Sequence, residues 1–375
     1  MPHPTEDAVR EALAGVIDPE IRRSIVELDM VESIDIAADG HVSVTVLLTV
    51  AGCPLKDTIT RDTEAAVTRV PGVTGVSVSL GAMTPEQRAQ MRERLQGPGR
   101  AREIPFARKD SLTRAYAVAS GKGGVGKSTV TANLAAAFAR RGLRVGVVDA
   151  DIYGFSIPGM MGLAGQPTKV DEMILPQVGH GVKVMSIGMF VEPGQAIVWR
   201  GPMLHRALQQ FLTDVFWGDL DILLLDLPPG TGDIAISVSQ LLPGSELLVV
   251  TTPQQAAAAV AERAGAISKQ TEQRVAGVIE NMSWLELPDG TTMDVFGSGG
   301  GDRVAANLSE ILEAPIDVLG RIPLDPPVRE GSDAGVPAVL ASPEAPAARA
   351  LDAIAGRLAS RGRGLAGMRL GLLPE

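Results

Sequence analysis

The chain has 375 residues and a formal net charge of −10, and 45% of its residues are hydrophobic. Its length exceeds that of one typical domain, so we expect two domains with a sizeable core. The acidic balance argues against nucleic-acid binding as the main purpose, because such binding depends on clustered lysine and arginine side chains. We therefore expect no nucleic-acid partner.

The sequence gives no sign of export or of membrane insertion. Its first residues, MPHPTEDAVREALAGV, include acidic side chains and lack a long apolar stretch, so they predict no secretory signal. No run of about 18 or more apolar residues occurs, which predicts neither a membrane span nor stable membrane association. Cys53 is the single cysteine, so no internal disulfide can form. We expect a cytoplasmic protein.

The first part of the chain predicts a small α+β domain over residues 1–95. Hydrophobic periodicity indicates, in chain order, a helix, two strands, a helix and a strand at 5–16, Val26–Ile36, His41–Val50, Lys56–Val70 and Val73–Leu80. A further helix is expected over Pro85–Leu95, with Thr84 as its N-cap. Residues 96–112 are rich in glycine, proline and arginine and are interpreted as a linker.

Residues 113–360 predict a second, larger α/β domain, and residues 361–375 a tail. Short apolar runs indicate strands at 115–120, Arg144–Val148, Val182–Ile187, Ile222–Leu225, Leu247–Thr251, Val275–Ile279 and Ile316–Leu319. Helices are expected between several of them, at Lys127–Arg141, Met203–Phe216, Ile234–Leu242, Gln254–Lys269 and Arg303–Leu312. Alternating apolar strands and helices predict a mostly parallel sheet covered by helices on both faces.

A phosphate-binding loop follows the first of these strands. The pattern G-x-x-x-x-G-K-[ST] is met by the residues Gly121, Lys122, Gly123, Gly124, Val125, Gly126, Lys127, Ser128 and Thr129. Glycines let backbone N–H groups turn toward phosphates, and the following helix offers its positive N-terminus. Lys127 adds a charge for the β- and γ-phosphates, and Ser128 is expected to hold magnesium. The motif predicts a nucleotide-binding protein of the P-loop NTPase fold.

Three aspartates follow predicted strands and so are expected at the same edge of the sheet as the loop. Asp226 ends an apolar strand in the manner of a Walker B element, and Asp149 and Asp151 follow the strand at 144–148. An isolated aspartate more often caps a helix or closes a turn. Beside a phosphate loop, we assign Asp226 and Asp149 to magnesium and Asp151 to positioning the hydrolytic water.

These residues resemble the deviant Walker A ATPases, which include MinD, ParA and the nitrogenase iron protein. GKGGVGKST is the signature of that group, and segments 148–158, 225–233 and 278–283 look like its Mrp/ApbC branch, the iron-sulfur cluster carrier ATPases. The resemblance implies a magnesium-dependent ATPase that forms a homodimer, with Lys122 reaching the nucleotide of the other subunit. It also implies that Asn281 and the backbone around Pro323 lie near the adenine.

The first domain resembles a small iron-sulfur assembly domain. Asp18-Pro19-Glu20 and the later Gly52-Cys53-Pro54-Leu55 carry this likeness, together with the expected order of helices and strands. Many relatives carry Cys-x-x-Cys shortly after the segment at 278–283, but residues 284–293 of this chain contain no cysteine. Cys53 is therefore either a small buried residue or a ligand of an iron-sulfur cluster, and the sequence favours neither.

The resemblance implies an ATP-binding and ATP-hydrolysing factor that works with assembly factors and delivers iron-sulfur clusters to apoproteins. One alternative is a MinD- or ParA-like dimer switch that acts on a membrane or on partner proteins without a cluster. Glycines at 362, 364 and 367 weaken a C-terminal membrane helix, so this alternative ranks lower. A third alternative is an adaptor whose first domain is the contact surface and whose nucleotide is regulatory.

Overall fold

The computed structural model describes residues 3–49, 56–96, 103–108, 110–152, 154–170, 173–190, 201–230, 233–254 and 257–361. Its residues group into two compact units. Unit 1 contains 1–103, 167–176 and 214–218, and unit 2 contains 104–166, 177–213 and 219–375. The domain limits expected from the sequence stay predictions, and the predicted tail beyond Arg361 lies outside the described residues.

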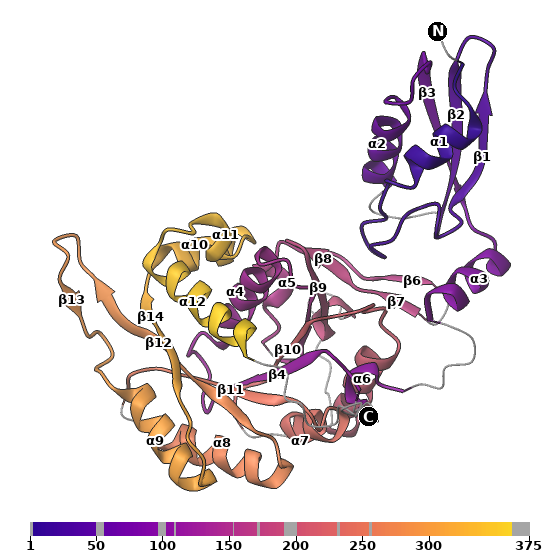
Figure 1. Cartoon of the computed structure of the whole chain (residues 1–375). Coiled ribbons are helices and arrows are strands. Elements are labelled where there is room, and N and C mark those ends of the chain that lie inside the picture. Colours follow the sequence, from indigo (N-terminus) through magenta and orange to yellow (C-terminus); the bar gives the residue numbers. More distant parts are fainter. Residues whose placement is uncertain are drawn as a thin grey trace, which may run out of the picture. The chain divides into compact units, whose positions relative to one another are not determined.

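Unit 1 is built around a three-stranded sheet with the order β1-β2-β3 (Figure 1). β2 pairs antiparallel with β1 and parallel with β3, and α2 makes the crossover that a parallel pair requires. The helices and strands are α1 (Glu6–Leu13), β1 (Val31–Ile36), β2 (His41–Leu48), α2 (Lys56–Val67), β3 (Gly75–Ala82) and α3 (Pro85–Gln96). This arrangement confirms the small α+β unit that the sequence predicts.

Local sequence explains these elements. Alternate residues Val42, Val44 and Val46 of β2 are buried, as expected for a strand with one face on the core. Helix α3 begins after Thr84, whose hydroxyl accepts from Gln87 N at 3.2 Å, while Thr84 N donates to Gln87 Oε1 at 2.8 Å. This reciprocal pair is a capping box, and it confirms the predicted helix start.

The strand expected from Val26 is wrong at its beginning, since β1 starts only at Val31. The preceding residues form turns, with Leu28 N donating to Ser24 O at 3.0 Å and Asp29 N to Val26 O at 3.1 Å. Asp29 has a φ of 59°, which no extended strand allows. Leu28 and Met30 are buried in the core of unit 1, so tertiary packing overrides the β propensity of this stretch.

Two short segments from the second predicted domain belong to unit 1. One is a hairpin of β6 (Thr168–Val170) and β7 (Met173–Leu175), which pair antiparallel. The other is 214–218, which lies along β7, because Ile174 N donates to Asp214 O at 2.9 Å and Phe216 N donates to Ile174 O at 2.8 Å. The helix predicted to reach Phe216 therefore ends earlier, at Thr213.

Unit 2 is an α/β structure in which helices cover both faces of a central sheet. Its sheet runs β13-β12-β11-β4-β10-β5-β9-β8, with β14 also paired to β12, and among the described residues the edge strands β8 and β13 pair antiparallel while the others are parallel. The strands are β4 (Arg114–Ala119), β5 (Val145–Asp149), β8 (Gln177–Gly179), β9 (Val182–Ser186), β10 (Ile222–Asp226), β11 (Glu246–Thr251), β12 (Val275–Glu286), β13 (Thr292–Met293) and β14 (Val318–Leu324). The mostly parallel sheet confirms the predicted fold class.

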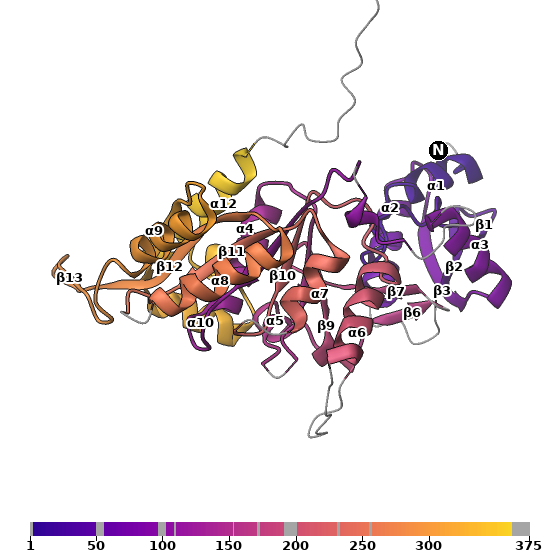
Figure 2. The ribbon, with the colours of Figure 1, turned by 90° about the horizontal axis from the view of Figure 1, so that it is seen from below.

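Helices cover both faces of this sheet (Figures 1 and 2). One face carries α4 (Lys127–Arg140), α5 (Ile157–Met160), α10 (Pro326–Ala334), α11 (Ala338–Ala341) and α12 (Pro346–Ser360). The other carries α6 (Gly201–Thr213), α7 (Asp233–Leu241), α8 (Ala257–Thr271) and α9 (Gly300–Leu312). Two short 3-10 helices, η1 (Pro105–Ala107) and η2 (Ile187–Phe190), complete the unit. Within the described residues, no helix has the length and apolar character needed to cross a membrane.

The strand order brings three chain segments together at one edge of the sheet. β10 lies between β4 and β5, and Asp226 at its end is in register with Val118 on β4 and Asp149 on β5. Because these strands are parallel, the loops that follow them leave from the same edge. The phosphate-loop motif after β4 and the aspartates after β5 and β10 are thus neighbours in space.

Candidate functional site

The glycine-rich segment forms a loop between β4 and α4. Gly124 and Gly126 have φ of +76° and +78°, a region that side chains with a Cβ rarely adopt. Gly126 is the N-cap of α4, so the first amide groups of this helix open toward the loop. The remaining predicted phosphate-binding residues stand in this same loop or in the first turn of α4, namely Gly121, Gly123, Val125, Lys127, Ser128 and Thr129. Such a loop is suited to a phosphate anion.

Asn281 supports the loop from β12. Its side-chain amide Nδ2 donates to the carbonyl oxygen of Val125 at 2.9 Å, and a Cβ on Gly126 would collide with this same amide group. Pro323 is buried in β14, next to Ile322, which is in register with Asn281. The family resemblance implies that both residues lie near the adenine, and that role stays a prediction. The structure adds that Asn281 fixes the loop backbone.

Lys127, Ser128 and Asp226 meet in a buried polar network. The Lys127 ammonium lies 2.7 Å from Asp226 Oδ2, and both side chains are nearly inaccessible, at 6% and 1% exposed. The Ser128 hydroxyl lies 2.6 Å from the same carboxylate oxygen. A buried carboxylate is costly unless charge and hydrogen bonds compensate it, and here both are present.

Thr131 completes the network and was missed by the sequence analysis. Its hydroxyl oxygen lies 2.8 Å from Asp226 Oδ1 and 3.0 Å from the carbonyl oxygen of Lys127, and its single proton can serve one acceptor at a time. Thr131 is fully buried on α4, four residues after Lys127 and thus on the same face of the helix. That spacing is the signal that could have identified it.

Asp149 holds the chain that follows β5. Its carboxylate accepts from Asp151 N at 3.2 Å, from Ile157 N at 3.3 Å and from the Ser186 hydroxyl at 3.2 Å. Burial, and to a lesser extent the neighbouring Asp226 carboxylate, raise the pKa of Asp149 to about 7, although the two backbone donors and Lys127 oppose the shift. The contacts place Asp149 as a support for the loop that carries Asp151, besides its predicted role toward magnesium.

Asp151 lies at the start of that loop and is 8% exposed. Its Oδ1 accepts from Gly154 N at 3.0 Å, which closes a tight turn of the kind aspartate favours. Among the described residues no donor contacts its second carboxylate oxygen, so Oδ2 can accept a hydrogen bond from a water molecule. The predicted role toward the hydrolytic water stays a prediction.

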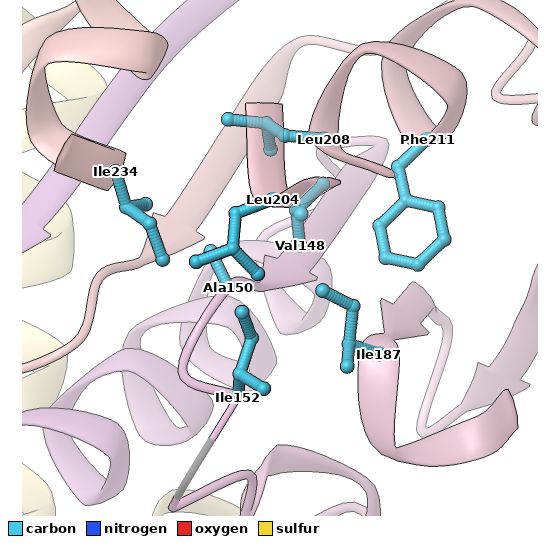
Figure 3. A pocket seen from close by; sticks show the side chains of 8 residues that line it. All are labelled: Val148, Ala150, Ile152, Ile187, Leu204, Leu208, Phe211 and Ile234. Atoms are coloured by element: carbon cyan, nitrogen blue, oxygen red, sulfur yellow. The ribbon is translucent and has the colours of Figure 1, made fainter. Parts of the chain in front are cut away.

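An apolar pocket anchors the loops on this edge of the sheet (Figure 3). Its side chains come from β5 and the loop after it, from η2, from α6 and from the first turn of α7, and they are Val148, Ala150, Ile152, Ile187, Leu204, Leu208, Phe211 and Ile234. Apolar residues thus alternate with Asp149 and Asp151 along the chain. Packing of Ala150 and Ile152 into the pocket fixes the intervening Asp151.

Lys122 lies apart from the Lys127–Asp226 pair. Its ammonium hydrogen-bonds the side-chain oxygen of Gln254, and its carbonyl oxygen accepts from the Ser120 hydroxyl at 3.0 Å. Arg263 on α8 donates to the carbonyl oxygen of Gly121 at 2.6 Å. The two lysines of the motif therefore have different partners, and neither Gln254 nor Arg263 was identified from the sequence.

The oxygen donors around Asp226 fit a magnesium ion. Magnesium prefers hard oxygen ligands and is typically held by one or two carboxylates together with substrate phosphates. The Ser128 hydroxyl and the carboxylates of Asp226 and Asp149 are such donors at the phosphate-loop edge. No cluster of three or more histidine, cysteine, aspartate or glutamate side chains suited to a metal occurs among the described residues. The set therefore matches a nucleotide-associated cation.

Neither expected place for iron-sulfur ligands offers a described thiol. Cys53 and its neighbours Gly52 and Pro54 lie outside the described residues. The stretch where relatives of the resembled family carry Cys-x-x-Cys is here a β-hairpin, in which Leu285 of β12 is in register with Met293 of β13. Its turn is closed by Gly290 N donating to Leu287 O at 2.9 Å.

Family profiles match both parts of the chain. Residues 111–359 match the profile described as NUBPL iron-transfer P-loop NTPase. Residues 6–79 match the profile described as iron-sulfur cluster assembly protein. The first match spans more than half of the sequence and includes the phosphate loop and all three aspartates.

Individual proteins are similar over nearly the whole length. An iron-sulfur cluster carrier protein of Mycobacterium tuberculosis is 62% identical over 367 residues, which cover 98% of this chain and 96% of the relative. One of Deinococcus radiodurans is 44% identical over 358 residues, covering 95% of each. A solved nucleotide-binding protein of Archaeoglobus fulgidus in complex with ADP is 37% identical and matches with a TM-score of 0.53, covering 64% of this chain and 93% of that chain.

Proposed function

Because the chain belongs to the family of NUBPL iron-transfer P-loop NTPases, we propose that it hydrolyses ATP and delivers iron-sulfur clusters to apoproteins. The observation that carries the ATPase part is the buried network of Lys127, Ser128 and Asp226 beneath the phosphate loop. The carrier part is supported by relatives of similar length that bear the name iron-sulfur cluster carrier protein.

Phosphate binding is assigned to the loop and to Lys127. Backbone N–H groups at the N-terminus of α4 donate to phosphate oxygens, and Lys127 shares its ammonium between Asp226 and the β- and γ-phosphates. Ser128, Asp226 and Asp149 would hold magnesium, which when bound neutralises charge on the phosphate oxygens. Thr131 keeps the Asp226 carboxylate oriented for this task.

Hydrolysis is assigned to a water molecule positioned by Asp151. The water oxygen attacks the γ-phosphorus, the bond from that phosphorus to the bridging oxygen breaks, and ADP and phosphate leave. Asp151 Oδ2 accepts a hydrogen bond from this water and so aligns it, while the turn to Gly154 and the support from Asp149 fix the carboxylate. Positioning and electrostatics supply most of the rate enhancement in such sites.

Lys122 is assigned a role toward the nucleotide that the second subunit of a homodimer binds. Its ammonium is held by Gln254 rather than by Asp226, so it serves a different partner from Lys127. The proposed homodimer would let this ammonium reach the nucleotide of the other subunit. The hydrogen bond from Arg263 to the carbonyl oxygen of Gly121 fixes the backbone next to Lys122 and supports this assignment.

The cluster is cargo, and Cys53 is the proposed thiolate that binds it. One cysteine per chain cannot complete a four-thiolate site, so further ligands would come from the dimer partner or from a small thiol such as glutathione. A dimer built from two copies of this chain supplies two thiolates.

Anaerobic reconstitution with iron and sulfide tests the carrier function. We expect wild-type protein to hold stoichiometric iron with visible absorption from sulfur-to-iron charge transfer, and Cys53→Ala to hold none. Iron in both proteins would contradict the assignment of Cys53. If neither holds iron while ATP is hydrolysed, direct cluster binding is refuted, and the MinD- or ParA-like switch becomes the better interpretation.

A further inference from the structure

The Asp18-Pro19-Glu20 motif is a buried turn in unit 1. Asp18 Oδ1 accepts from Glu20 N at 2.9 Å and from Ile21 N at 2.8 Å, so it closes the turn on itself. Asp18 and Glu20 are only 4% and 8% exposed. Asp18 is thereby occupied within the turn, whereas the Glu20 carboxylate extends to another segment.

Glu20 is bonded to a residue far away in the sequence. Its Oε1 accepts from the Thr168 hydroxyl at 2.8 Å, across 148 positions of the chain. Thr168 is the first residue of β6, in the hairpin that leaves the ATPase sequence and joins unit 1. A hydrogen bond from a hydroxyl to a buried carboxylate is strong because few water molecules compete for it.

Apolar packing holds the same segments to unit 1. The hydrophobic core of unit 1 includes, from the hairpin and from 214–218, the buried residues Val170, Met173, Leu175 and Phe216. Helix α1, strand β2 and helix α3 supply Leu13, Val46 and Met91 to this core. The hydrophobic core of unit 1 therefore includes residues from two segments that the sequence analysis places in the second domain.

Both inserted segments are joined covalently to the nucleotide-site elements. The hairpin follows α5, whose first residue Ile157 donates to Asp149, and precedes β9, whose last residue Ser186 donates to Asp149. Segment 214–218 follows α6 and precedes β10, which ends in Asp226. A shift of the acidic residues on nucleotide binding would act on these connections.

We infer that the Glu20–Thr168 hydrogen bond docks the hairpin on unit 1 and that nucleotide binding is thereby coupled to this unit. The inference rests on the proposed nucleotide binding. Such coupling is reciprocal. If bound nucleotide changes the equilibrium constant for docking of the hairpin by some factor, docking of the hairpin changes the affinity for nucleotide by the same factor. Loss of one hydrogen bond to a buried carboxylate is expected to change the docking equilibrium by about 10-fold.

Docking is tested first on the full-length chain without nucleotide. Thr168→Val removes the hydroxyl and keeps the shape, whereas the control Thr168→Ser keeps a hydroxyl. We expect amide hydrogen exchange in residues 16–30 and 167–170 to be about 10-fold faster in Thr168→Val than in Thr168→Ser. Equal exchange in the two variants would overturn the docking role of this bond.

Coupling is tested on the same proteins with ADP and magnesium. In wild type and Thr168→Ser, we expect nucleotide to change exchange in residues 16–30. In Thr168→Val we expect this response to be weaker, although calorimetry still detects binding. A full response in Thr168→Val, or no response in wild type that binds ADP, would overturn the coupling. If calorimetry detects no binding to wild type, the proposed function fails, whereas the nucleotide-free exchange still decides the docking.

Discussion

Buried carboxylates occur in both units, but their partners differ. Asp226 in unit 2 lies against the Lys127 ammonium and two hydroxyl groups. Asp18 and Glu20 in unit 1 are bonded to backbone N–H groups and to the Thr168 hydroxyl. One site thus pairs a buried negative charge with a cation, whereas the other holds its carboxylates with neutral donors.

The difference distinguishes a site whose hydrogen-bond partners can be shared with a ligand from a site whose partners are fixed within the fold. A cation and hydroxyl groups around a carboxylate can be shared with phosphate and magnesium, so the network at Asp226 can change partners. Neutral donors compensate burial only partly, and burial raises the pKa of both Asp18 and Glu20. We interpret Asp18 and Glu20 as docking groups because their hydrogen bonds go to their own turn and to Thr168 of the hairpin.

The largest effect is expected from Lys127→Ala. This change removes the phosphate charge and leaves Asp226 buried without its cation, so nucleotide affinity should fall by about 100-fold and stability by about 3–5 kcal/mol. Calorimetry and thermal unfolding measure the two effects. Adding Asp226→Asn to Lys127→Ala should restore stability but not binding, and retained binding in Lys127→Ala would contradict the assignment.

Asp151→Ala should separate hydrolysis from binding. Loss of the group that aligns water is expected to lower turnover by about 100-fold, while nucleotide affinity changes little because the phosphate loop is intact. Phosphate release and calorimetry give the two quantities. Asp289→Ala on the exposed hairpin turn is a matched control, and turnover in Asp151→Ala equal to wild type would refute the role.

Thr131→Val tests whether the Thr131 hydroxyl supports Asp226 in the buried polar network. The variant keeps the shape of the side chain but removes the hydroxyl next to Asp226 Oδ1, at a cost of about 1–2 kcal/mol. We expect turnover to fall by about 10-fold and Thr131→Ser to retain most of it. Steady-state kinetics decide the matter, and a Thr131→Val enzyme as active as wild type would show that Asp226 needs no support from Thr131.

Glu20→Gln should have the smallest effect, and it depends on pH. The folded-state pKa of Glu20 is raised, so stability is fully present below the ordinary carboxyl pKa and declines as pH rises toward the raised value. Gln keeps the acceptor for Thr168 without ionising, so it should stabilise the protein at about pH 7.5 and have little effect at about pH 4. Urea unfolding at both pH values measures this difference, and a loss of stability at the higher pH would contradict it.

Local patterns predicted which segments meet at the phosphate-loop edge of the sheet. The strand before Gly121, the helix from Lys127 and the positions of Asp149 and Asp226 at strand ends all follow from short-range signals, and the structure places them together. Thr131 was within reach of the same reasoning, since it stands four residues after Lys127 on one helix.

Long-range pairing explains what the sequence did not reveal. Strands β6 and β7 have three residues each, too few for a hydrophobic period, and Ile174 pairs with Val215 about forty positions later. Nothing local to Thr168 indicates that its partner is Glu20. The strand predicted to start at Val26 was wrong for a similar reason. Its apolar residues form turns and are buried by long-range packing in the core of unit 1.

Transfer of a cluster to an apoenzyme is the most direct test of the central claim. Wild-type protein reconstituted anaerobically would be mixed with an apoenzyme whose activity requires a [4Fe–4S] cluster, with magnesium and either ATP or ADP. We predict that activity appears, that its rate differs between ATP and ADP, and that Lys127→Ala abolishes this difference. No recovered activity, or recovery at one rate with either nucleotide, would contradict a nucleotide-driven cluster carrier.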